Sequence, residues 1–344
     1  MIRAFLTLLG VLFAAWGLPG YGQSCGPQAL VVNILSARGL PIPGLSASSF
    51  RASSHGKAAN VLSASLRNDP STRTYVLLDT GSTMGGLGAQ GIDKWKIARA
   101  AASEFLATAP PQAEISLETF SDIVGRRFPS SGGREVMAEW LNGAESLRAS
   151  ELKGKSAIHR TILETAEAME PARPGDSIFV VTDGRNDNNL SMTARVADEL
   201  ASHGIRLFSF VLDDSRRADN GITAGGMIES SGPPNPGAKE LFDLVKDSGG
   251  VGYTLYPGGN RVGQSFGVSY EYDERTHQNV RASVTEIEIA ISNFYILTVG
   301  LLDHTRGLQD FQLQLVDARG KQKKDMILTF PTRIPGCPVP AFGR

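Results

Sequence analysis

The feature that most constrains the fold of this 344-residue chain is a regular alternation of apolar runs and helix-like segments between residues 75 and 256. The apolar runs are short and nearly continuous, as in Tyr75-Val76-Leu77-Leu78. The segments between them repeat apolar residues at helical spacing and end at proline or glycine. Apolar strands that alternate with helices form a parallel sheet covered on both faces. We therefore predict a doubly wound, mainly parallel α/β domain.

The order of the predicted elements places two aspartates at one edge of the sheet. We predict strands at residues 75–78, 115–120, 177–181, 206–212 and 251–255. We predict helices at residues 92–106, 135–147, 158–169, 193–202 and 238–247. Asp79 directly follows the first strand, and Asp183 lies two residues after the third. Because ligands of such sheets bind beyond the carboxyl ends of the strands, both aspartates are expected in a binding region.

The two flanks have a different pattern from the central part. Short β-like runs occur at 29–35 and 60–65, and further runs follow at 294–301, 310–316 and 325–330, after a helix around 284–292. A hairpin-like turn at 317–320 joins the last two runs. Since neither flank holds many strands, we predict that both build one β-sandwich-like module. The predicted organisation is a signal peptide at 1–22, an N-terminal β segment at 23–72, the α/β domain at 73–258, and a C-terminal β segment at 259–344 that packs with 23–72.

The N-terminus is typical of an exported protein. Arg3 precedes a short apolar stretch at 4–16, and we expect cleavage before Gln23, with an uncleaved anchor as the alternative. Export would bring the chain to the periplasm or the cell exterior, without a membrane span in the mature part. In that oxidising environment Cys25 and Cys337 are expected to form one disulfide, and two unpaired thiols are the alternative. With 34 basic and 35 acidic residues, nothing favours nucleic acid as a partner.

The stretch Val76-Leu77-Leu78-Asp79-Thr80-Gly81-Ser82 fits the catalytic loop of an aspartic peptidase. That chemistry needs two carboxylates that share one proton. A second motif, Asp247-Ser248-Gly249, is present, but the apolar residues before it have helical spacing. The chain between the motifs alternates strand and helix, whereas a pepsin-like lobe is nearly all β. A peptidase acting through Asp79 is therefore the less favoured alternative.

Four stretches in sequence order together resemble a known family. They are Leu77 to Met84, Phe120-Ser121-Asp122, Gly154-Lys155-Ser156-Ala157-Ile158 and Val181-Thr182-Asp183-Gly184. In this order and spacing they resemble the von Willebrand factor type A (VWA) domain, and in particular secreted bacterial proteins related to it. The resemblance covers most of the mature chain, including the β-like flanks.

The resemblance implies a metal-ion-dependent adhesion site at the upper edge of the sheet. Asp79 and Asp183 would supply the carboxylates, and Thr83 and Ser156 the hydroxyls. The implied ion is Mg²⁺, with Mn²⁺ and Ca²⁺ as alternatives, because hard cations prefer oxygen ligands. Gly81 stands where the family has its first loop hydroxyl, and Ser82 is the neighbouring substitute. An occupied site and a degenerate scaffold therefore both remain open.

The expected function is that of an exported, non-enzymatic binding or adhesion module. An unknown protein or cell-surface partner would bind the upper face of the VWA-like domain, where polar loops carry recognition. These loops are residues 85–91, 185–189 and 216–237. The alternative is a structural or assembly scaffold in which the metal site is vestigial.

Overall fold

The fold was analysed in a computed structural model of the chain. It describes residues 26–68, 71–85, 94–122, 125–143, 151–185, 192–213, 222–224, 236–255, 274–301 and 307–336. The predicted signal peptide and the predicted Cys25–Cys337 disulfide lie outside these residues, as do most of the three polar loops. Of the described helices, none is long and apolar enough to cross a membrane.

The central part forms the predicted α/β sheet, with strand order β6-β5-β4-β7-β8-β10-β9. Five strands run parallel: β4 (Arg73–Asp79), β5 (Glu114–Phe120), β7 (Ser177–Thr182), β8 (Arg206–Leu212) and β10 (Gly252–Leu255). Two short strands that were not predicted pair antiparallel at the edges: β6 (Arg127–Phe128) and β9 (Ile222–Ala224). The prediction of a mainly parallel sheet is confirmed.

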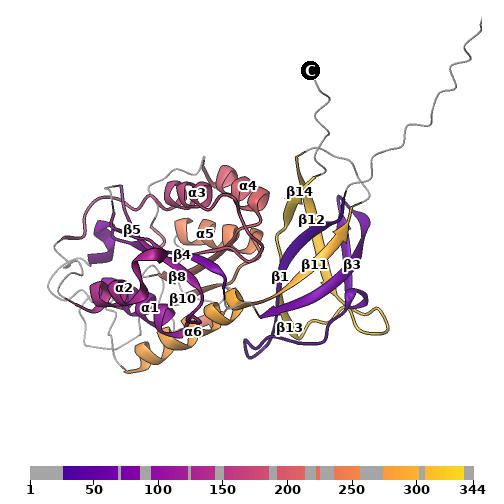
Figure 1. The fold of residues 1–344 in the computed structure, drawn as a ribbon, viewed down its shortest axis with the longest axis horizontal. Coiled ribbons are helices and arrows are strands. Elements are labelled where there is room, and N and C mark those ends of the chain that lie inside the picture. Colours follow the sequence, from indigo (N-terminus) through magenta and orange to yellow (C-terminus); the bar gives the residue numbers. More distant parts are fainter. Residues whose placement is uncertain are drawn as a thin grey trace, which may run out of the picture.

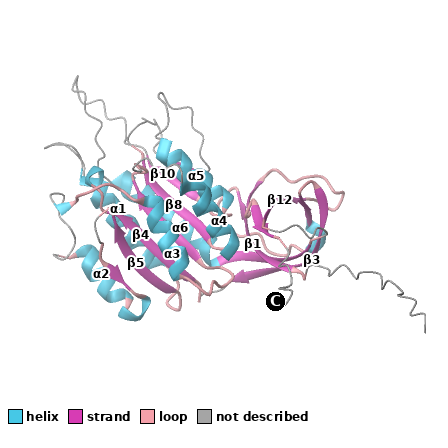
Figure 2. Ribbon diagram, turned by 90° about the horizontal axis from the view of Figure 1, so that it is seen from above, coloured by secondary structure: helices cyan, strands magenta, loops and turns pink. Residues whose placement is uncertain are grey.

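Helices cover both faces of this sheet (Figures 1 and 2). One face packs against α1 (Lys94–Thr108), α2 (Arg134–Asn142) and α6 (Glu274–Ser292). The other face packs against α3 (Ile158–Ala168), α4 (Thr193–His203) and α5 (Pro236–Asp247). Successive strand side chains alternate between the two cores, so Val76 and Leu78 join the first and Leu77 joins the second. Burial on both faces explains why the strands are continuously apolar.

Both flanks together form a second sheet, as predicted, but its form differs from the prediction. Its order is β13-β1-β11-β3-β2-β12-β14, and all its strand pairs are antiparallel. The strands are β1 (Gln28–Ser36), β2 (Phe50–Ser54), β3 (Lys57–Asn68), β11 (Asn293–Gly300), β12 (Leu308–Leu315), β13 (Met326–Thr329) and β14 (Arg333–Pro335). This is one curled sheet around its own core, not two stacked sheets (Figure 2). We call it the β module.

The turn at 317–320 is present, but it does not make a hairpin of the strands that it joins. The Gly320 amide donates to the Asp317 carbonyl, and only an isolated bridge links Val316 with Gln322. β12 pairs with β2 and β14, whereas β13 crosses to β1. Local sequence predicts the turn, but strand pairing is decided by distant parts of the chain. Short 3-10 helices lie at Ala47–Ser49, Ser82–Gly85 and Ser130–Gly132.

The two bodies are joined by continuous chain and by a buried arginine. Helix α6 lies on the α/β sheet although it belongs to the segment 259–344, and it runs directly into β11. Arg206 at the start of β8 is almost fully buried. Its guanidinium donates to the Asn33 side chain of β1 at 3.1 Å and to the carbonyls of Gly175, Ala290 and Ile291. Arg206 therefore ties the α/β sheet to the end of α6 and to the β module.

Candidate functional site

Asp79 ends β4 at the carboxyl edge of the α/β sheet, and its side chain is fully buried. One carboxylate oxygen accepts hydrogen bonds from the Gly81 amide and the Ser156 hydroxyl, both at 2.8 Å. The other oxygen accepts a hydrogen bond from the Thr182 hydroxyl at 2.6 Å. Asp79 therefore connects three segments: its own loop, the loop before α3, and the end of β7.

The pKa of Asp79 is raised to about 7, chiefly by burial and secondly by the nearby charge of Asp183. The three hydrogen-bond donors act against this shift because they stabilise the charged carboxylate. The structure thus brings together the two carboxylates that the sequence placed at one edge. Two carboxylates close together repel each other when both are charged, so a nearby cation would stabilise them.

Lys94 supplies a cation to one of the two carboxylates. Asp183 follows β7 and is fully buried, and the Lys94 Nζ lies 2.8 Å from its Oδ2. The Arg185 amide donates to the Oδ1 of Asp183 at 3.1 Å, and the Arg185 guanidinium lies 3.8 Å from the Oδ2. Lys94 was included in the predicted helix 92–106 but was not identified as a site residue. No local signal distinguished Lys94 from Lys96, which lies two residues further along the same helix and is exposed.

The predicted hydroxyl ligands are only partly brought to the aspartates. Ser156 contacts Asp79, as described above, and is buried. Thr83 is half-buried and Ser82 is exposed, and both lie in the 3-10 helix after Gly81. The Ser82 amide donates to the Gly154 carbonyl at 2.9 Å, so the backbones of the two loops are joined directly.

The arrangement of these residues does not fit the Mg²⁺ site that the resemblance implies. Mg²⁺ demands oxygen ligands in near-octahedral geometry at short distances. Here a Cβ on Gly81, where the family has a hydroxyl residue, would stand 2.4 Å from the Ser156 Oγ. On the other side, the Oδ2 of Asp183 is already paired with the Lys94 ammonium group.

The structure does not bring together the two aspartates of the peptidase alternative. Asp247 ends α5, and its Oδ1 accepts a hydrogen bond from the Thr332 hydroxyl of the β module at 2.8 Å. The next residue, Ser248, accepts a hydrogen bond from the Leu207 amide near the amino end of β8. Asp79, by contrast, lies at the carboxyl end of β4. The Asp247 motif therefore belongs to the contact between the two bodies.

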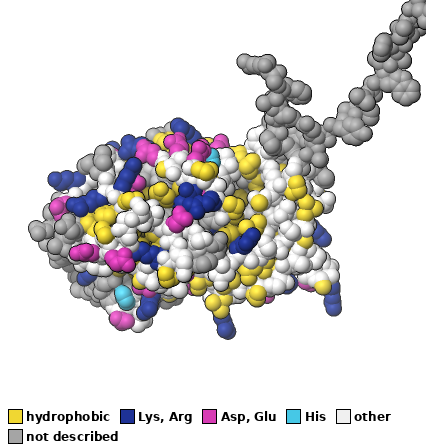
Figure 3. All heavy atoms as spheres, in the orientation of Figure 1, with side chains coloured by type: hydrophobic (Ala, Val, Ile, Leu, Met, Phe, Trp, Pro, Cys, Tyr) yellow, Lys and Arg dark blue, Asp and Glu magenta, His cyan; other side chains and the backbone are white. Residues whose placement is uncertain are grey.

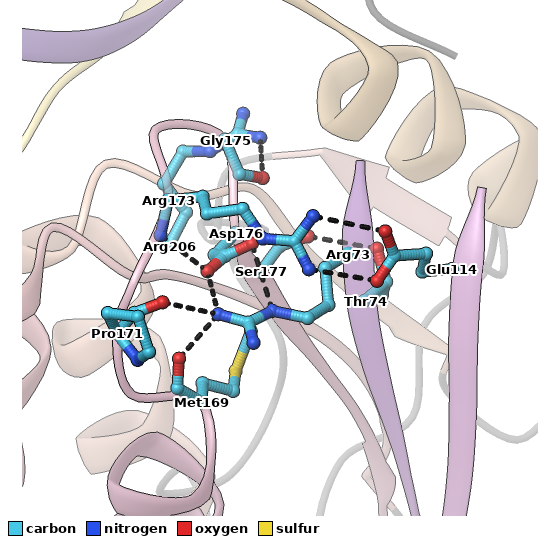
Figure 4. A network of polar contacts seen from close by, with 10 residues as sticks. All are labelled: Arg73, Thr74, Glu114, Met169, Pro171, Arg173, Gly175, Asp176, Ser177 and Arg206. Atoms are coloured by element: carbon cyan, nitrogen blue, oxygen red, sulfur yellow. Dashed lines mark hydrogen bonds and ion pairs between the residues drawn. The ribbon is translucent and has the colours of Figure 1, made fainter. Parts of the chain in front are cut away.

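A second polar network lies at the amino edge of the sheet, opposite the aspartate pair (Figure 4). Arg73 at the start of β4 pairs with the buried Asp176, and it also donates to the carbonyls of Met169 and Pro171. Arg173 forms a two-pronged pair with Glu114 at 3.0 and 2.9 Å. These contacts hold the α3–β7 connection against the first strands. They were not predicted, because no local pattern marks them.

One further cluster has the side-chain types of a metal site. The His203 Nε2 lies 3.1 Å from Glu170 and 3.0 Å from Glu199. Among the described residues, this is the group of three such side chains whose ligand atoms lie close enough together to share an ion. All three are at least partly exposed. Pairing with the histidine accounts for their arrangement without an ion.

No protein-family model and no curated protein matches this chain. Several solved structures do. An aerotolerance-related membrane protein from Bacteroides fragilis is 16% identical, over 64% of this chain and 98% of that one, with a TM-score of 0.41. BatB from Bacteroides thetaiotaomicron is 15% identical, over 63% of this chain and 97% of that one, with a TM-score of 0.41.

The VWA domain of SpRpn10 is 10% identical, over 62% of this chain and 97% of that one, with a TM-score of 0.38. At these identities and TM-scores, the similarities identify neither a function nor a partner for this chain.

Proposed function

We propose that this chain is an exported, non-enzymatic protein-binding module whose VWA-like domain presents its carboxyl edge to a partner. The observation that carries the proposal is that Asp79 and Asp183 are bonded to groups of the same chain. Both are fully buried, and their oxygens accept hydrogen bonds from neighbouring loop and strand groups or pair with Lys94. The two aspartates hold the edge loops in place, and the loops offer the contact surface.

Burial also argues against a catalytic role for this pair. A general base or a nucleophile must lie within hydrogen-bond reach of a substrate. Asp79 and Asp183 have no exposed surface, and their hydrogen-bond donors include Ser156, Thr182 and Lys94 of the same chain. An enzyme using them would have to open the edge before each turnover.

The N-terminal pattern described above supports export, and the charge distribution supports a protein or cell-surface partner. Basic and acidic side chains are interspersed over the α/β domain on the face seen in Figure 3. Nucleic-acid binding depends on clustered positive charge that meets phosphates. The balance of 34 basic and 35 acidic residues offers no such excess.

A matched pair of surface variants tests the proposal. Ser82→Arg adds a bulky charge at the exposed edge beside Asp79, and Ser65→Arg adds the same group on the exposed side of β3 in the β module. The tagged chain is incubated with envelope and secreted fractions of its source cell, and captured proteins are identified after cross-linking. We expect one specific protein to be captured by wild type and Ser65→Arg, and lost with Ser82→Arg.

The two alternatives give different results in the same assay. A scaffold that assembles through the β module would lose its partner with Ser65→Arg and keep it with Ser82→Arg. An acid peptidase would cleave proteins in the fractions at low pH and lose this activity on Asp79→Ala. Either outcome contradicts recognition at the carboxyl edge.

A further inference from the structure

The lysine at the carboxyl edge is buried to an unusual degree. The Lys94 side chain is 6% exposed, and Asp183, which it contacts at 2.8 Å, is not exposed at all. Lysines are almost never fully buried unless they are paired, because transferring an ammonium group out of water is costly. The contact with Asp183 therefore accounts for the burial of the lysine.

The burial of Lys94 is not matched by the other lysine in this part of α1. Lys94 is buried, whereas Lys96, two residues further along the same helix, is exposed. A buried charged side chain needs a tertiary reason, because local sequence does not require it. The described residues supply one: the buried carboxylate of Asp183, whose Oδ2 lies 2.8 Å from the Lys94 Nζ, beside the buried carboxyl group of Asp79.

The lysine also stands where an ion would have to bind. A divalent ion needs lone pairs on oxygen, whereas an ammonium group offers three N–H donors and no lone pair. With Nζ at 2.8 Å, the Oδ2 of Asp183 already has a cation at hydrogen-bond distance. On the Asp79 side, a Cβ on Gly81 would stand 2.4 Å from the Ser156 Oγ, so a hydroxyl residue at this position would require the Ser156 side chain to move away from Asp79.

We propose that the Lys94 ammonium is a built-in cation that replaces the divalent ion at this edge, so that the edge is assembled without metal. The ammonium compensates one of the two buried carboxylates, and the hydrogen bonds from Gly81, Ser156 and Thr182 stabilise the other. This inference concerns the cation alone, and it holds whether or not the edge binds a protein partner.

The wild-type chain gives the first test. Its unfolding temperature is measured in a chelator and in millimolar MgCl₂ or MnCl₂, and bound Mn²⁺ is counted by electron paramagnetic resonance after equilibrium dialysis. We expect the same unfolding temperature in all buffers and no stoichiometric Mn²⁺. A ligand of the native state must raise stability, so a rise of about 4 °C or more with one bound Mn²⁺ per chain would overturn the proposal.

Replacing the lysine gives the second test. Lys94→Met removes the ammonium but keeps an unbranched side chain. Asp183 then loses the cation at 2.8 Å and keeps the more distant, exposed Arg185 guanidinium at 3.8 Å. We expect a lower unfolding temperature in chelator, partly restored by Mn²⁺ or Mg²⁺. Lys96→Met removes an exposed lysine from the same helix and is the matched control, with no change in either buffer. The proposal would also be contradicted if the Lys94→Met chain had the unfolding temperature of wild type and Mn²⁺ did not change it.

A double variant covers the case in which Lys94→Met fails to fold. Lys94→Met with Asp183→Asn removes both members of the ion pair, and Asp79 keeps its hydrogen bonds from Gly81, Ser156 and Thr182. We expect this chain to fold and to be insensitive to divalent ions. If the double variant also fails to fold while Asp183→Asn alone folds, packing of the lysine stem rather than its charge is required, and the proposal is wrong.

Discussion

Gly81 lies against Ser156 so closely that a Cβ on it would stand 2.4 Å from the serine Oγ and 3.1 Å from an Asp79 oxygen. The backbone of Gly81 is not in the left-handed region, so space rather than conformation requires glycine here. The Gly81 amide meanwhile donates to Asp79. The residue that departs from the VWA loop motif is therefore adapted to a tightly closed loop.

At this scale, we predict that Gly81→Ser does not restore a metal site. The new side chain would force Ser156 to rotate and to lose its hydrogen bond with Asp79, at a cost of about 1–3 kcal/mol. Urea unfolding with and without Mg²⁺ measures both effects. Gly81→Ala should be destabilised to a similar extent, and Ser82→Ala, at an exposed position, should behave like wild type. A higher free energy of unfolding of Gly81→Ser in Mg²⁺ than without it would contradict this prediction, because it would show that the new hydroxyl helps to bind the ion.

At the scale of elements, local patterns predicted most helices and strands of the α/β domain. Helix α4 ends at His203, and Gly204 takes the left-handed conformation (φ 65°, ψ 25°) that glycine favours at this position. Helix α6 was predicted only around 284–292, whereas it begins at Glu274. Its first two turns are mostly polar and carry little apolar periodicity, so they were not recognised.

Helix α6 also carries a buried carboxyl group with a consequence for pH dependence. Burial raises the pKa of Glu288, while a hydrogen bond from Ser292 at 2.6 Å and the charge of Arg134 act in the opposite direction. Because the folded-state pKa is above that of the unfolded chain, the folded state binds the proton more tightly. The stability contributed by this group is present below the unfolded pKa and is lost as the pH rises through the folded one.

We therefore predict that the free energy of unfolding of wild type falls relative to that of Glu288→Gln as the pH is raised from about 4 to neutrality. The variant keeps the size of the side chain and cannot ionise. Urea unfolding of both chains at several pH values measures the difference. Glu274→Gln, at an exposed position of the same helix, is the control and should follow wild type. A gap that is constant, or that widens in favour of wild type, would contradict the prediction.

At the scale of the whole molecule, the α/β domain depends on chain that follows the β10 strand. The side chains of Val280, Val284, Ile287 and Ile291 on α6 are almost fully buried in the core that they share with α1 and the sheet. Burying one such side chain contributes about 1.5–3 kcal/mol, and a whole domain is stable by only about 5–15 kcal/mol. Loss of α6 would remove a large part of that stability.

We predict that a fragment covering 73–258, the α/β domain as delimited from sequence, is aggregated or lacks cooperative unfolding. A fragment covering 73–292 retains α6 and should unfold cooperatively at a lower temperature than the full chain, because the contacts of Arg206 with Asn33 are absent. Calorimetry and size-exclusion chromatography compare the two. Equal behaviour of the fragments would show that α6 is dispensable.

The sequence by itself determined the α/β class, the flanks that pair with each other, and the edge at which Asp79 and Asp183 lie. These follow from periodicity and strand order, which are local properties of the chain. Only the tertiary structure decided that the β module is one curled sheet, that α6 lies on the α/β domain, and that Lys94 pairs with Asp183. The last two residues are separated by 89 positions, and no local pattern records such a contact. Side chains from distant segments meet only when the sheet is assembled, so the charge balance of the edge could not be predicted from either segment.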